Sequence, residues 1–193
     1  MIHLHCTKKL FTQLPLGNSG RFPAHQQTNG QSGTAANDPA FHPDDTAKEN
    51  PLNHWHANLL TPQGSHCILF VHNATRFPVL VPDLKKADFP LLEDFFTDIF
   101  MNTLLKLGAS DQLMERTTHL LAPFVCDTQC DRSVQGTINR MGQDVEHLLL
   151  VDNMAVKDLL PYSTSVWLAE TLTGVKGIKD YIRPSEEMLA LLS

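Results

Sequence analysis

The sequence contains neither a long apolar run nor a secretory signal. Within its 193 residues, no stretch approaches the roughly 20 consecutive apolar residues that a membrane-spanning helix requires. The first residues, Met1 to Cys6, alternate apolar and polar side chains and show no continuous apolar run with a small-residue cleavage site. We therefore expect a cytoplasmic protein that does not associate with membranes.

Positive charge and cysteine are also scarce. The chain has 15 Lys and Arg against 21 Asp and Glu, a formal charge of −6 at pH 7. This balance argues against a protein that grips nucleic acid through bulk positive charge, although it is compatible with a local basic pocket. Four cysteines are too few for a disulfide scaffold in a chain of this length, so we expect them to be reduced.

What the sequence does contain is an ordinary apolar fraction of 42%, arranged with the periods of strands and helices. Residues 54–82 have the pattern of three strands of one sheet. The first strand should present Trp55, Ala57 and Leu59 on one face and His54, His56 and Asn58 on the other. A further strand over residues 2–6 alternates in the same way, so His3 and His5 share its polar face.

The second and third strands of this stretch should form a hairpin. Asn73-Ala74-Thr75 predicts a three-residue loop between them. A loop of this length pairs His72 with Arg76 and places Val71 opposite Phe77. The residues that this register puts on one core face are Cys67, Leu69, Val71, Phe77, Val79 and Val81.

Helical periods follow the sheet. The main packing helix should begin at Asp88 and end at Gly108, and another should cover residues 132–150 from a cap at Asp131 or Ser133. Together these patterns predict one α+β domain over residues 1–193, with a small mixed or mainly antiparallel sheet packed by several helices. Residues 17–51 are rich in Gly, Asn, Gln, Ser, Pro and Asp and predict a flexible polar insert, and residues 155–193 predict a helical C-terminal tail.

Three short blocks of the sequence are similar to those of a known family. They are Cys6-Thr7-Lys8-Lys9-Leu10, Trp55-His56-Ala57-Asn58-Leu59, and Asp131-Arg132-Ser133 with Asn139. The chain thereby resembles a bacterial family of small uncharacterised cytoplasmic proteins described as a domain of unknown function. The resemblance implies that the three blocks belong together, and it carries no catalytic role to any residue.

Cations stand at the starts of two predicted helices. Lys8 and Lys9 follow the cap residue Thr7, and Arg132 follows Asp131. A helix N-terminus already carries partial positive charge, so cations there are electrostatically misplaced. Either an anion such as a phosphate compensates them, or the lysines are solvated and tolerate a small cost. The residues that we predict to bind a phosphate-bearing or nucleic-acid ligand, with Trp55 stacking on a base or ring, are Lys8, Lys9, Trp55, Asn58, Asp131, Arg132 and Asn139. In the structural alternative, Asp131 caps the helix and pairs with a cation, while Trp55 is core.

Metal binding and nucleophilic catalysis are weaker interpretations. The pairs that could supply metal ligands are His3 with His5, His54 with His56, and Cys126 with Cys130. Ten histidines make chance pairs common, and the cysteine pair has no second pair to match it, so we expect no metal and no cofactor. Cys6 and Cys67 fall on predicted core faces, where a cysteine is usually inert.

The sequence therefore favours a binding protein for an anionic ligand over an enzyme. One alternative is a phosphoester hydrolase that uses a histidine-bound metal. Another is a protein-interaction or inhibitor module that contacts a protein partner through the insert and the tail.

Overall fold

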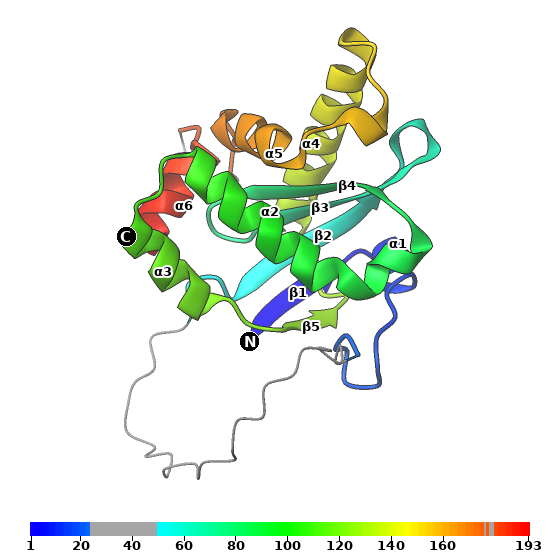
Figure 1. The fold of residues 1–193 in the computed structure, drawn as a ribbon, viewed down its shortest axis with the longest axis horizontal. Helices are drawn as coiled ribbons and strands as arrows, with labels where there is room; N and C mark the ends of the chain where they lie inside the picture. The colour runs from blue at the N-terminus through cyan, green and yellow to red at the C-terminus, as the bar shows by residue number, and fades with distance from the viewer. Residues whose placement is uncertain (24–49, 176, 178–179) are drawn as a thin grey trace, which may run out of the picture.

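The computed structural model describes residues 1–23, 50–175, 177 and 180–193, and it contains a five-stranded sheet (Figure 1). The strands lie in the order β4-β3-β2-β1-β5. Their bounds are β1 Ile2–Cys6, β2 His54–Leu60, β3 His66–His72, β4 Pro78–Leu84 and β5 Phe124–Asp127. β1 is parallel to β2 and β5, whereas β3 is antiparallel to β2 and β4. The predicted α+β fold with a mixed sheet is confirmed.

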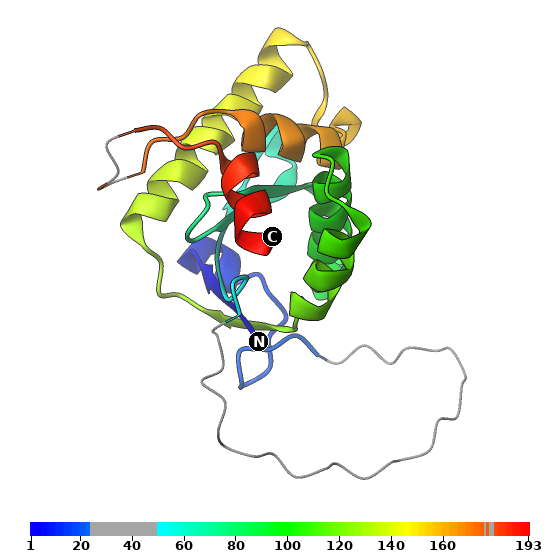
Figure 2. The same cartoon turned by 90° about the vertical axis from the view of Figure 1, so that its left-hand side faces the viewer.

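Helices lie on both sides of the sheet. The α-helices of the described chain are α1 Lys8–Phe11, α2 Leu92–Lys106, α3 Asp111–Leu120, α4 Arg132–Val151, α5 Pro161–Glu170 and α6 Pro184–Leu192. The helix predicted from Asp88 starts instead as a 3-10 helix over Lys86–Leu91 and continues as α2. Figure 2 shows the sheet between α2 and α4. Among these helices, none has both the length and the apolar character needed to cross a bilayer.

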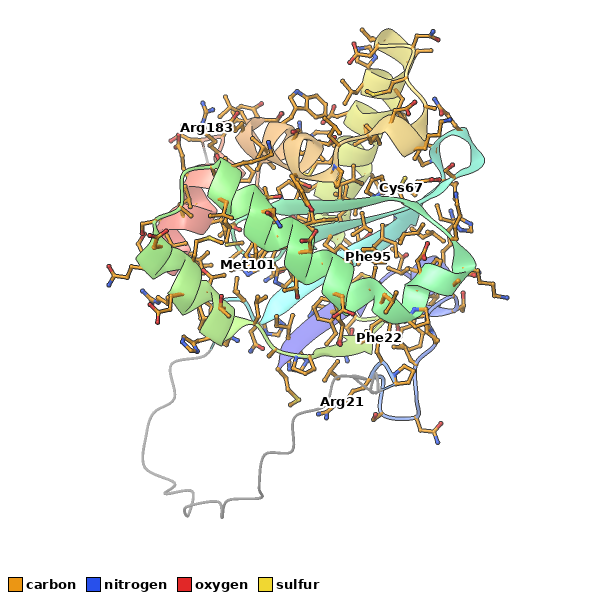
Figure 3. The ribbon with its side chains drawn as sticks, in the orientation of Figure 1. Arg21, Phe22, Cys67, Phe95, Met101 and Arg183 are labelled. Atoms are coloured by element: carbon orange, nitrogen blue, oxygen red, sulfur yellow. The ribbon has the colours of Figure 1, made fainter. Side chains whose placement is uncertain are left out.

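The face of the sheet under α2 holds the larger core. Trp55 is fully buried there, as the alternation on β2 predicts. Its ring meets Phe96 and Phe100 of α2 nearly edge-on, with centroid separations of 4.8 and 5.5 Å. Phe95 and Met101 of the same helix are partly buried against this core (Figure 3). Full burial of an apolar side chain stabilises a fold by roughly 1.5–3 kcal/mol, so this face dominates the packing.

α4 covers only part of the opposite face. Its predicted apolar stripe is buried, and the residues of the stripe are Val134, Ile138, Met141, Val145 and Leu149. Among the described residues, the apolar cluster under α4 includes side chains of β3 and β4 and none of β1 or β5. The half of this face on β1 and β5 therefore stays polar and partly exposed.

The predicted register of the β3–β4 hairpin is wrong by one residue. Val71 pairs with Pro78, where the sequence predicts Val71 opposite Phe77. Arg76 causes the difference because its backbone is left-handed, with a φ of 59°, so it belongs to a four-residue loop. A one-residue slip moves side chains to the other face of a strand. The predicted single core face is thus divided between Phe77, Val79 and Val81 under α2 and Cys67, Leu69 and Val71 under α4.

Both edges of the sheet are protected by hydrogen bonds from other segments. At β4, the backbone N–H of Leu80 donates to Oγ of Ser165 in α5 at 3.0 Å. At β5, the backbone N–H of Cys126 donates to the Gly20 carbonyl at 2.8 Å. Each of these hydrogen bonds pairs one backbone group of an edge strand, and an edge with fewer free backbone groups is less open to pairing with other chains. The predicted insert continues from this Gly20 segment, and its residues 24–49 lie outside the described part of the chain.

Candidate functional site

Two rows of histidines lie side by side on the half of the sheet face that α4 leaves open. The parallel register of β1 and β2 places His3 opposite His54 and His5 opposite His56. The rings of His3 and His5 stack on His54 at centroid separations of 5.3 and 5.4 Å. The rings of His5 and His56 are 4.8 Å apart. Two strands that are distant in sequence thus supply one continuous group of imidazoles.

The Asp127 carboxylate orients the protons of this group. Oδ1 of Asp127, on β5, lies 2.8 Å from Nδ1 of His5. Because a carboxylate only accepts, Nδ1 of His5 donates to it, and Nε2 of a neutral His5 accepts from Nδ1 of His54 at 3.2 Å. Asp127, His5 and His54 form a hydrogen-bonded chain. The His5 and Asp127 side chains are 14% and 33% exposed, so solvent reaches the chain.

Asp127 is held in its ionised form. Partial burial raises the pKa of the Asp127 carboxyl. The hydrogen bonds from His5 and from the backbone N–H of Gln129 outweigh burial and hold that pKa below its usual range. The negative charge beside His5 is therefore permanent at neutral pH.

His56 differs from its neighbours because it is only 2% exposed. Its Nδ1 accepts from the backbone N–H of Asp131 at 3.4 Å, and its Nε2 donates to Oδ1 of Asn73 at 3.2 Å. Burial, reinforced by the nearby His5, lowers the pKa of His56 to about 4. His56 thus joins β2, the hairpin loop and the start of α4 as a neutral side chain.

His72 is a second neutral histidine, on the opposite face. Its Nδ1 accepts from the backbone N–H of Thr75 at 3.3 Å, and its Nε2 donates to the Pro51 carbonyl at 3.1 Å. Burial lowers the pKa of His72 to about 4. His72 therefore ties the segment that precedes β2 to the end of β3.

Arg76 is a buried cation with no carboxylate in contact among the residues that the structure describes. It is 6% exposed, and its guanidinium donates to the Asn73 carbonyl and, at 3.4 Å, to Oγ of Ser133. Its Nε has no hydrogen-bond partner in the described part of the chain. Burial lowers the pKa of Arg76, and the charge of Asp131 opposes this effect. Buried guanidinium groups usually pair with a carboxylate or a phosphate, so this charge is incompletely compensated.

These residues form one contiguous set, which we term the polar array. It consists of His3, His5, His54, His56, Arg76, Asp127 and Asp131.

The start of α4 borders the polar array. The Asp131 carboxylate accepts from the backbone N–H groups of Val134 and Ser133 at 3.0 and 2.7 Å, which lowers its pKa and confirms the predicted cap. The helix N-terminus is therefore occupied by its own cap. Arg132 is exposed beside it. Asn139 is also exposed, but it lies roughly 12 Å further along the helix axis, so α4 carries it away from the array.

Asn58 and the two lysines lie at the carboxyl end of β1 and β2. Oδ1 of Asn58 accepts from Oγ1 of Thr7 at 2.8 Å, and the exposed Lys8 and Lys9 begin α1 directly after Thr7. Trp55 lies in the core on the other face, where its indole N–H donates to the Leu52 carbonyl at 3.1 Å. The structural alternative therefore describes Trp55 correctly, and its ring presents no face for a ligand to stack on.

The sequence pattern does not single out Arg76, His5 or Asp127 as ligand-binding residues. His5 shares a face with His3 by simple alternation, but only the pairing of β1 with β2 and β5 brings it to His54 and Asp127. Arg76 fits a strand as well as a loop, and no Gly or Pro in the loop signals its left-handed backbone. The available signal was the repeated His-x-His pattern in two predicted strands.

A cavity of about 170 Å³ adjoins the polar array at His54. It is lined by Asn50, Pro51, Asn53, His54, His72, Asn73 and Ala74. Its volume exceeds the roughly 30 Å³ that one water molecule occupies in the liquid, and its lining includes the side chains of three asparagines and two histidines. It therefore extends the array with space for a small polar group.

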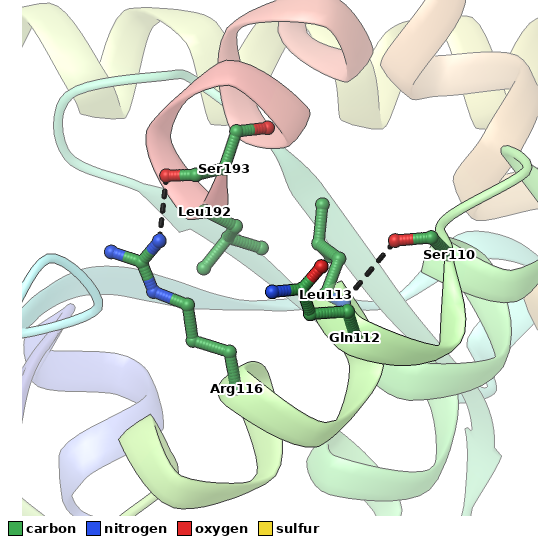
Figure 4. Close-up of a pocket in the computed structure, with 6 residues that line it drawn as sticks. All are labelled: Ser110, Gln112, Leu113, Arg116, Leu192 and Ser193. Carbon is green, nitrogen blue, oxygen red and sulfur yellow. Dashed lines mark hydrogen bonds between the residues drawn. The ribbon is translucent and has the colours of Figure 1, made fainter.

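A cavity of about 290 Å³ lies elsewhere, between α3 and α6 (Figure 4). Its charged side chain, Arg116, already donates to the Ser193 carbonyl at 2.6 Å. Ser110 caps α3 by accepting from the backbone N–H of Leu113 at 3.3 Å. These polar groups serve local structure, so the polar array is the better candidate site.

Three of the four cysteines are poor nucleophiles. Hydrogen bonding with Cys126 and burial raise the pKa of Cys6, and burial raises the pKa values of Cys67 and Cys130. A raised pKa keeps a thiol protonated and weakly nucleophilic. Within the described residues, no three His, Cys, Asp or Glu side chains are arranged to hold a metal ion.

Comparison with known proteins places the chain in a family. Neither a search of curated proteins nor a search of solved structures found a match. A scan against family models matched residues 3–187, a range that contains every residue of the polar array. The chain belongs to the family described as Domain of unknown function (DUF6933).

Proposed function

We propose that the chain is a binding protein that recognises an anionic, phosphate-bearing ligand at the polar array. The observation that carries the proposal is Arg76, a guanidinium at 6% exposure. Within residues 1–23, 50–175, 177 and 180–193, its Nε has no hydrogen-bond partner and no carboxylate contacts it. Burying a cation is unfavourable unless opposite charge compensates it. An anion on the adjacent surface would supply that compensation.

The surroundings of Arg76 support the same proposal. Imidazole groups of the array and side-chain amides of the adjoining cavity are hydrogen-bond donors for phosphate oxygens. Lys8, Lys9 and Arg132 add exposed cations at its borders. In this proposal, histidines of the array make the ligand contacts that the sequence predicts for Trp55 and Asn139. We propose further that the protein acts in a bacterial cytoplasm.

Thermal unfolding with added phosphates tests this function. Pyrophosphate, trimetaphosphate or a 5′-phosphorylated oligonucleotide should raise the melting temperature, since a ligand at 100 times its Kd stabilises the folded state by about 2.7 kcal/mol. A 5′-hydroxyl oligonucleotide separates recognition of a nucleic-acid end from recognition of free phosphate. If none of these anions stabilises the protein, the proposed function is wrong.

Charge-removing variants localise the binding. Arg76→Asn removes the buried cation but keeps a residue that tolerates a left-handed backbone. Arg132→Ala removes an exposed cation beside the array. Both should weaken anion binding, whereas Lys106→Ala, an exposed cation at the end of α2, should not. Equal losses in all three would indicate a nonspecific charge effect.

A phosphoester hydrolase is the second candidate. The hydrogen-bonded chain of Asp127, His5 and His54 beside a cavity favours it, because such chains orient a histidine for proton transfer. Stoichiometric transition metal in the purified protein, with hydrolysis of bis(p-nitrophenyl) phosphate that a chelator abolishes, would support the metal-dependent form. A protein partner for the insert is a separate prediction, on residues that lie mostly outside the described chain.

A further inference from the structure

The fixed charges of the polar array do not favour an anion while its histidines are neutral. The array contains one guanidinium, that of Arg76, and two carboxylates, those of Asp127 and Asp131. The hydrogen bonds that each carboxylate accepts hold both carboxyl pKa values below their usual range, so both groups are ionised. The flanking cations Lys8, Lys9 and Arg132 are exposed, and so is the Asp131 carboxylate, so water and salt screen these charges. Arg76 is buried and Asp127 is partly buried, so their charges are screened less. The less screened charges of the array, those of Arg76 and Asp127, cancel, so a phosphate would meet no net positive charge there.

Two of the buried histidines cannot correct this balance by taking up a proton. Nδ1 of His56 accepts from the backbone N–H of Asp131, and Nδ1 of His72 accepts from the backbone N–H of Thr75. Their Nε2 atoms donate to Asn73 and Pro51. Each ring therefore uses its lone pair for a hydrogen bond that protonation would break.

The His5–His54 pair differs because protonation does not remove the hydrogen bond between its two rings. A proton added to either ring leaves a hydrogen bond between Nε2 of His5 and Nδ1 of His54, since one ring always donates and the other accepts. The Asp127 carboxylate, 2.8 Å from Nδ1 of His5, stabilises the resulting imidazolium. Histidine is also the side chain whose charge commonly changes between about pH 5 and 8.

We propose that the polar array binds its phosphate-bearing ligand together with a proton, which the His5–His54 pair takes up from solvent. The proposal rests on the proposed function and adds its ionic mechanism. The added proton then gives the array a positive charge toward the ligand. The charged and titratable groups around the pair are His3 from β1, His56 from β2, Asp127 from β5, Arg76 from the hairpin loop, and Cys130 and Asp131 before α4, with His72 of β3 acting from the opposite face of the sheet.

Calorimetry with trimetaphosphate measures the coupling between ligand binding and proton uptake. The phosphates of trimetaphosphate stay ionised between about pH 5 and 8. Titrations at pH 7 in two buffers of different ionisation enthalpy should give different observed enthalpies and an uptake of up to about one proton per ligand. The affinity should fall as pH rises, by up to about tenfold for each pH unit. If the ligand binds with equal enthalpy in both buffers and with no pH dependence, the proton coupling is wrong while the proposed function stands.

Variants assign the proton to the pair. His54→Gln and His5→Gln should each lower the proton uptake, whereas His147→Gln, an exposed histidine on the solvent side of α4, should leave it unchanged. Asp127→Asn keeps an acceptor for His5 but removes the charge, so it should flatten the pH dependence and strengthen binding at pH 8. Unchanged proton uptake in His54→Gln and His5→Gln would overturn the assignment. Absence of binding by any phosphate at any pH would instead reject the proposed function.

Discussion

Two sets of histidines in this protein have opposite environments. His56 and His72 are each 2% exposed, and a backbone N–H group donates to each of their rings. His3, His5 and His54 stack on one another at a partly exposed surface, with the Asp127 carboxylate at one side. The difference shows that residue type alone does not assign a role. A histidine with its lone pair committed to the backbone is structural, whereas one linked to a carboxylate at the surface can exchange protons.

Acid should destabilise the protein mainly through the buried histidines, His56 and His72, and this is the largest effect that we expect. Burial lowers the pKa values of His56 and His72 to about 4, below the usual value near 6.5 that applies in the unfolded chain. Between these pH values the unfolded state binds more protons than the folded state, so stability falls as pH falls. Urea denaturation at pH 7.5 and 4.5 should show a loss of about 2–3 kcal/mol for each buried histidine. The loss should be smaller in His72→Gln, and equal stability at the two pH values would contradict the neutral assignment.

Truncation of one member of each set should give unequal losses of stability. His72→Ala leaves the backbone groups of Pro51 and Thr75 without their partner, so it should lower the free energy of unfolding by about 2–3 kcal/mol. His54→Ala, at the partly exposed surface, should cost less than about 1 kcal/mol. Chemical denaturation of both variants at pH 7.5 measures this difference, and similar losses would remove the distinction between the sets.

A glycine outside the sheet packs closely against β5, the strand whose Asp127 contacts the partly exposed histidines. Gly20 has a φ of 70°, and a Cβ at this position would lie 2.6 Å from the carbonyl oxygen of Cys126 in β5. Gly20→Ala should therefore cost roughly 1–2 kcal/mol and displace the strand that carries Asp127. Gly64→Ala is the matched control, because Gly64 has a φ of 80° with open space around it. If the two variants lose equal stability, the contact with β5 is unimportant.

Asp127→Asn should have the smallest effect on stability. The carboxylate is 33% exposed, and partly exposed ion pairs contribute less than about 1 kcal/mol. The substitution should instead change the NMR signals of the His5 and His54 rings. A large loss of stability would show that Asp127 holds the fold and does not merely orient the histidines.

Local patterns predict much of this fold correctly. The alternation of β1 and β2, the apolar stripe of α4 and its cap at Asp131 all depend on neighbouring residues, so the sequence alone reveals them. The hairpin register was not predictable in this way. It depends on Arg76, a residue without a strong left-handed preference that nevertheless adopts a φ of 59°.

The candidate site is harder to predict for a related reason. The two His-x-His pairs are visible in the sequence, but the parallel pairing of β1 with β2 and β5 joins residues that lie 49 and 122 positions apart. The sequence prediction selected Lys8, Lys9 and Arg132 because they stand at helix starts. The structure places them exposed at the borders of the array. The buried Arg76 and the Asp127 carboxylate acquire their importance only from tertiary contacts.

Titration of trimetaphosphate followed by NMR of the histidine rings tests the central claim most directly. At pH 6.5, the signals of His3, His5 and His54 should move together as the ligand binds. The signals of the neutral pair, His56 and His72, should keep the chemical shifts of neutral rings, and that of the distant His147 should not move. No movement of the surface set, or protonation of the buried pair on binding, would contradict the division of the histidines on which this account rests.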